Sequence, residues 1–157
     1  MKTKTQFLMA AVLGASLAIP GQANAGEKEL RKSQVPKAVV EAFEKAHPNA
    51  KKVEFEEETF EGKTAYEVEY KEDGREYELL YDADGTLLQK EEEIDVKALP
   101  EQISQAVTKA HPKAKIKEAE KVMKPDGTVT GYEVEIKEGR KELELDASGQ
   151  ILKTEED

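Results

Sequence analysis

The apolar residues of this chain recur with two different periods, and each period occurs twice. Along residues 35–47 they fall three or four positions apart, as in Val35, Val39 and Phe43, and the spacing returns along residues 99–111. This spacing places side chains on one face of a helix. Afterwards apolar and charged residues alternate singly, as in an antiparallel strand with one buried and one solvated face. We therefore expect a helix followed by strands, in two successive copies.

Short motifs recur at matching places in the two copies. An apolar-Pro pair opens each predicted helix, at Val35-Pro36 and Leu99-Pro100, and Ala-His-Pro ends it, at 46–48 and 110–112. Proline is tolerated in the first turn of a helix, and the residue before a proline disfavours helix. A Tyr-Glu-Val-Glu strand and an Asp-Ala-x-Gly turn follow in each copy, at 66–69 with 82–85 and at 132–135 with 146–149.

These patterns predict an α+β fold made of two tandem repeats, residues 35–94 and 95–157. In each repeat one helix packs on a four-stranded antiparallel meander. A repeat of about 60 residues is marginal as an independent domain, so we expect the halves to form one compact unit. Whether the two sheets join stays open. Residues 26–34 carry no periodic apolar pattern and are predicted to be a flexible N-terminus.

Residues 1–25 have the pattern of a secretory signal peptide. Lys2 and Lys4 precede a mainly apolar run at 7–19, and Ala23-Asn24-Ala25 has the small-x-small form of a cleavage site. The run is shorter than the roughly 20 apolar residues of a membrane span. We therefore predict cleavage near Ala25 and a periplasmic or secreted protein.

The net charge of the chain limits the classes of partner that it can bind. The formal net charge is −10, with 24 basic and 34 acidic residues. Cleavage near Ala25 would remove two lysines and leave −12. Such a charge disfavours nucleic acid and anionic membrane surfaces, and it favours a basic partner surface or a cation. The chain has no Cys, so it has neither a disulfide nor thiol chemistry.

No pattern in the sequence indicates a catalytic site. His47 and His111 are repeat equivalents at helix C-termini, where a structural role with the helix dipole is the favoured interpretation. Asp82-Ala83-Asp84-Gly85 begins like a calcium loop, but an apolar strand follows immediately, which favours a hairpin turn. We therefore predict no enzyme activity, no cofactor and no metal site, and leave weak cation binding at these turns open.

The order and duplication of these motifs over residues 35–157 resemble the bacterial PepSY-like family, which is also described as beta-lactamase-inhibitor-like. The resemblance implies a helix-plus-four-strand unit used twice, a periplasmic location and no catalytic activity. Relatives with this architecture bind and restrain hydrolases. The absence of Cys and Trp departs from the beta-lactamase inhibitor proteins.

The resulting hypothesis is a non-enzymatic periplasmic binding module, which binds a protein and inhibits or restrains a secreted hydrolase through an exposed sheet face. The alternative is an acidic periplasmic protein that binds or buffers divalent cations with low affinity. The predicted binding residues are the glutamates on the sheet face away from the helices: Glu67, Glu69, Glu76, Glu78, Glu133, Glu135, Glu142 and Glu144.

Overall fold

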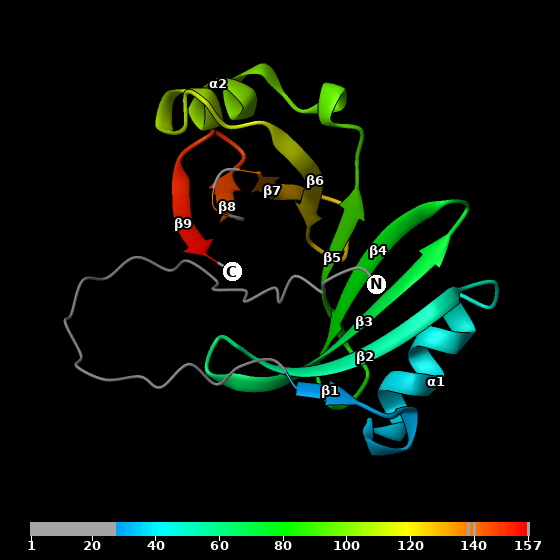
Figure 1. Cartoon of the computed structure of the whole chain (residues 1–157). Coiled ribbons are helices and arrows are strands. Elements are labelled where there is room, and N and C mark those ends of the chain that lie inside the picture. Colours follow the sequence, from blue (N-terminus) through cyan, green and yellow to red (C-terminus); the bar gives the residue numbers. More distant parts are fainter. Residues whose placement is uncertain (1–27, 138, 140, 157) are drawn as a thin grey trace.

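The protein is built around antiparallel strands, whose order in the sheet is the same as their order in the chain (Figure 1). The computed structural model describes residues 28–137, 139 and 141–156, and within them one nine-stranded sheet runs in the order β1 to β9. The strands are β1 (Lys28–Leu30), β2 (Lys51–Phe60), β3 (Lys63–Glu72), β4 (Arg75–Tyr81), β5 (Leu87–Glu93), β6 (Ile116–Met123), β7 (Val129–Ile136), β8 (Lys141–Asp146) and β9 (Ile151–Glu156).

Two helices begin and end where the sequence predicts. The helix α1 (Lys37–Ala46) starts after Pro36, and α2 (Glu101–Ala110) starts after Pro100. The histidine that follows each helix donates its backbone N–H to a carbonyl four residues earlier, at 2.8 Å in both cases. Short 3-10 turns, η1 (Lys32–Gln34) and η2 (Val96–Ala98), precede the two helices. Both helices lie on the outer side of a curled sheet (Figure 1).

Each helix covers its own half of the sheet and makes its own core. The first core is rich in aromatic residues: Val35, Val39, Phe43, Phe55, Val68, Tyr70, Leu79 and Tyr81. The second is aliphatic: Leu99, Ile103, Val107, Ala119, Val134, Ile136, Leu143 and Leu145. The alternation along the strands therefore assigns one sheet face to these cores and leaves the other face to the charged residues.

The sequence predicts a four-stranded meander in each half and leaves open whether the two join; in the structure β2–β5 and β6–β9 belong to one continuous sheet, so separate four-stranded sheets are not confirmed. Strand β5 pairs with β6 over four residue pairs, from Lys90↔Met123 to Glu93↔Glu120. This pairing removes two edges that would otherwise present unpaired backbone groups. We call the β5–β6 contact the seam.

The N-terminal segment is a second correction. Residues 28–34 were expected to be flexible, but Lys28–Leu30 pairs with β2 and Lys32–Gln34 forms a 3-10 turn. Leu30 packs against the first core, which gives the segment a reason to be ordered. The predicted signal peptide, residues 1–25, lies outside the described residues. Within those that are described, no helix is both long and apolar enough to cross a membrane.

Candidate functional site

The sheet face opposite the two helices carries glutamates on strand after strand. We call it the glutamate face. Its members alternate along the strands with the core residues, as Glu67 does with Val68 and Glu133 with Val134. By strand register they include Glu54, Glu56, Glu58, Glu67, Glu69, Glu76, Glu78, Glu91, Glu93, Glu118, Glu120, Glu133, Glu135, Glu142, Glu144 and Glu155.

All eight glutamates predicted as binding residues lie on this face, but the prediction that the face is exposed is wrong. The exposed fractions of Glu67, Glu78, Glu133 and Glu142 are only 5–8%. The other four, Glu69, Glu76, Glu135 and Glu144, are partly buried. The sheet is curled with this face on its inner side (Figure 1), and an inward-facing surface is less accessible to solvent than a flat one.

The strand register sets glutamates directly opposite one another. Glu78 pairs with Glu69 on β3 and with Glu91 on β5, and Glu133 pairs with Glu120 on β6 and with Glu144 on β8. Like charges in such cross-strand positions are destabilising. An inward-facing surface of this kind cannot hold all of its carboxylates ionised without compensation.

Burial raises the pKa of the carboxyl groups across the face. The pKa of Glu58 and that of Glu142 rise to about 7, and that of Glu120 to about 8, first because burial disfavours the charged form and then because of neighbouring glutamates. The pKa values of Glu78 and Glu133 are raised well above the usual range for the same reasons. Several of these groups therefore hold protons near neutral pH.

Lysines compensate the charge at the ends of the face. The Nζ of Lys153 lies 3.3 Å from Glu144 and 2.7 Å from Glu155, and Lys71 pairs with Glu76.

The opposite face of the sheet, which the helices cover, also has ion pairs. There Glu92 binds Arg75 at 2.6 Å and Lys121 at 2.9 Å.

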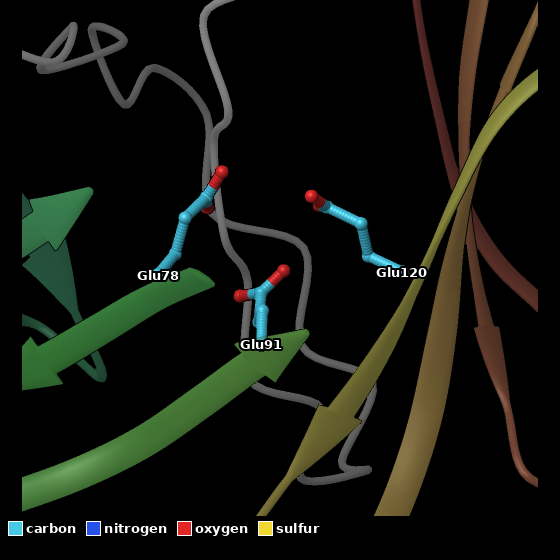
Figure 2. A group of neighbouring side chains, drawn as sticks. All are labelled: Glu78, Glu91 and Glu120. Carbon is cyan, nitrogen blue, oxygen red and sulfur yellow. The ribbon is translucent and has the colours of Figure 1, made fainter. Parts of the chain in front are cut away.

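Three glutamates from both halves of the chain meet at the seam. Carboxylate oxygens of Glu78 on β4, Glu91 on β5 and Glu120 on β6 all lie within 4.8 Å of one another. Figure 2 shows Glu78 and Glu91 reaching toward Glu120 from across the bend of the sheet. Sequence reasoning found Glu78 but missed Glu91 and Glu120. The pairing of β5 with β6 brings Glu91 near Glu120, and local sequence patterns do not report pairing between the two repeats.

His47 and the acidic turns make contacts that stabilise the fold. Tyr70 Oη lies 2.9 Å from His47 Nδ1, and the His47 ring stacks on Phe43. In the turns, Asp146 Oδ1 accepts backbone N–H groups of Ser148 and Gln150, each at 2.9 Å, and Asp84 Oδ1 accepts that of Thr86 at 2.8 Å. The hairpin-turn interpretation is confirmed, because these carboxylates hold the turns together.

A cleft of about 700 Å³ adjoins the glutamate face. Its walls include Glu133 and Glu144 of that face together with apolar side chains from the hairpins beside it. The apolar and aromatic residues of the lining are Phe60, Leu88, Val122, Met123, Pro125, Tyr132, Leu145 and Leu152, and Lys124 is the one basic residue among its described side chains. Leu152 is a large hydrophobic residue with 38% of its surface exposed. Acidic and apolar groups thus share one hollow.

Comparison with known proteins places this fold among bacterial relatives. A BLIP-like protein from Bacteroides fragilis matches with a TM-score of 0.53 and 24% identity, over 78% of this chain and 86% of that one. A protein of the DUF2874 family from Bacteroides uniformis matches with a TM-score of 0.60 and 15% identity, over 78% and 89%. One from Bacteroides eggerthii, described among "putative periplasmic proteins", gives 0.61 and 12%, over 78% and 88%. The search of curated proteins found no match.

Family models match both halves of the chain. Residues 36–84 match PepSY, described as "Peptidase propeptide and YPEB domain". Residues 88–153 match PepSY_like, described as "Putative beta-lactamase-inhibitor-like, PepSY-like". Each half of the chain is thus similar to a PepSY-type family, the first half to PepSY and the second to PepSY-like.

Proposed function

We propose that the chain is a non-enzymatic periplasmic module that binds another protein and restrains a secreted hydrolase. The observation that carries the proposal is the hollow where the apolar cleft meets the glutamate face. Protein interfaces combine a buried apolar anchor with a polar rim. The family matches support a binding role, since one describes a peptidase propeptide domain and the other a beta-lactamase-inhibitor-like domain.

The chemistry of the hollow defines the partner. Glu133 and Glu144 line the cleft beside Met123 and Leu152. A fitting surface would present an apolar side chain next to Lys or Arg, whose charge the glutamates attract. The net charge of −10 adds long-range attraction for a basic surface, which weakens as salt rises.

Affinity capture with matched variants tests this proposal. Leu152→Asp places a charge in the cleft at a position that is already exposed. Thr108→Asp adds the same charge at an exposed position on α2, across the sheet from the cleft. We expect the wild type and Thr108→Asp to capture the same periplasmic hydrolase in low salt, and Leu152→Asp to lose it.

An activity assay then tests restraint. Adding the purified protein should lower the turnover of the captured hydrolase, and Leu152→Asp should not. Equal capture by Leu152→Asp and Thr108→Asp would contradict binding at the cleft. Undiminished turnover at saturating protein would contradict restraint.

A further inference from the structure

The three glutamates at the seam have a geometry that the rest of the glutamate face lacks. Glu78 and Glu91 are directly opposite each other on β4 and β5. Glu120 is diagonal to Glu91, because its direct partner on β5 is Glu93. The carboxylate oxygens of the three converge within 4.8 Å of one another, and each comes from a different strand (Figure 2).

Each of these side chains ends in a buried oxygen that no hydrogen bond satisfies. The exposed fractions are 6% for Glu78, 3% for Glu91 and 6% for Glu120. The Oε2 atom of each is buried without a hydrogen-bond partner among the described residues. The other oxygen of Glu91, Oε1, accepts a hydrogen bond from the side chain of Gln89 at 3.2 Å. Buried polar atoms are nearly always paired, so three converging exceptions point to a missing partner.

We propose that Glu78, Glu91 and Glu120 are the protein ligands of a binding site for one hard divalent cation of calcium size. Their donors are carboxylate oxygens, which are the ligands of calcium and magnesium rather than of soft metals. Oxygens separated by up to 4.8 Å fit around an ion that holds its ligands at about 2.3–2.6 Å, as calcium does. Magnesium holds oxygens at about 2.0–2.1 Å in a strict octahedron and gives up its waters reluctantly, so three carboxylates fixed on three strands suit calcium better.

The electrostatics agree with this geometry. Burial, followed by the other carboxylates, raises the pKa of Glu120 to about 8 and the pKa values of Glu78 and Glu91 well above their usual range. Lysines serve glutamates nearer the ends of the face, but no ion pair joins the three seam glutamates to a described Lys, Arg or His. Without a cation the cluster therefore retains protons, and a bound cation displaces them.

Calorimetric titration of the purified protein, freed of divalent ions by a chelator, tests the site. We expect saturable binding of one calcium ion per chain, with protons released to the buffer, and weaker binding of magnesium. Glu91→Gln replaces one carboxylate by a neutral amide while keeping the side-chain shape, and the lost charge should weaken calcium binding at least tenfold.

Glu155→Gln is the matched control. Glu155 occupies the position on β9 that Glu91 occupies on β5, so the variant loses the same charge outside the cluster. It should bind calcium within a factor of two of the wild type. Circular dichroism checks that both variants are folded.

Three results would overturn the proposal: no saturable binding at millimolar calcium, equal weakening by both variants, or magnesium binding as tight as calcium binding. The first would leave the cluster as a set of carboxyl groups that share protons. None of these results depends on a protein partner, so the site fails or stands separately from the proposed function.

Discussion

The seam and the outer edge of the sheet present equivalent residues in different surroundings. Glu78 and Glu91 oppose each other on β4 and β5, and Glu142 and Glu155, sixty-four residues later, oppose each other on β8 and β9. Strand β5 pairs with β6, which contributes Glu120, whereas β9 is the last strand of the described sheet. The first pair therefore gains a third carboxylate, and the second does not gain one from a further strand.

One substitution between the copies completes the contrast. The residue two positions before Glu91 is Gln89, and the residue two positions before Glu155 is Lys153. Gln89 supplies a neutral donor, while Lys153 places its ammonium group 2.7 Å from Glu155. At the edge, the ammonium group of Lys153 compensates the carboxylate charge. At the seam, Glu91 has the neutral Gln89 in that place, and we propose that a bound cation compensates the charge there.

The largest expected effect is the pH dependence of stability without divalent ions. The folded protein holds protons up to about pH 7 on Glu142 and about pH 8 on Glu120, whereas an unfolded glutamate releases them near pH 4.5. The folded state thus binds more protons, and its stability falls as pH rises from about 5 to 8. For Glu142 alone the shift corresponds to roughly 3 kcal/mol.

Urea unfolding with a chelator, at several pH values, measures this dependence. Glu78→Gln should flatten it more than Glu142→Gln does, because Lys153 lowers the pKa of Glu142, whereas burial and neighbouring glutamates all raise that of Glu78. Stability that rises from pH 5 to pH 8 would contradict buried, protonated glutamates.

Exchanging Gln89 and Lys153 between the two copies should exchange how each copy compensates its carboxylate charge. Gln89→Lys supplies the seam with the cation that the edge already has. We expect about 1–2 kcal/mol of added stability at pH 8 without calcium, because one partner now compensates buried charge. The same variant should bind calcium at least tenfold more weakly in calorimetry, since the ammonium group repels the ion.

The reciprocal variant, Lys153→Gln, should lower stability at pH 8 by about 1 kcal/mol, because it leaves Glu144 and Glu155 without their ammonium partner. Its calcium affinity should match the wild type. If both variants changed calcium binding equally, the seam would have no special role.

The sequence predicted the helices and which residues share a sheet face, because both follow from local periodicity. Val39 and Phe43 lie in the core as their spacing requires, and Glu67 and Glu133 lie on the opposite face. Periodicity does not report how strongly a sheet bends. The inward turn of the glutamate face, which makes Glu67 buried rather than exposed, was therefore not predictable.

The seam cluster escaped prediction for a different reason. Glutamate occupies so many inner positions that no pair stands out, and the meeting of Glu91 with Glu120 depends on pairing between strands from different repeats. Strand β1 escaped prediction because its three residues, Lys28–Leu30, are too few to show a period of two.

The smallest expected effect concerns the helix side of the seam. Lys121 on β6 contacts Glu92 on β5 at 2.9 Å, and both side chains are less than one third exposed. At the edge, Lys141 contacts Glu156, which is 68% exposed. Lys121→Met should therefore cost about 0.5–1 kcal/mol, and Lys141→Met less than about 0.5 kcal/mol, because exposed ion pairs contribute little.

The pH dependence of the Lys121 effect identifies its origin. The hydrogen bond from Lys121 holds the pKa of Glu92 below its usual range. The stabilisation is therefore present at neutral pH and lost as acid protonates Glu92. Urea unfolding should give a difference between wild type and Lys121→Met that is larger at pH 7 than at pH 3. A difference independent of pH would assign the effect to packing of the lysine stem, and the seam would then owe no stability to this ion pair.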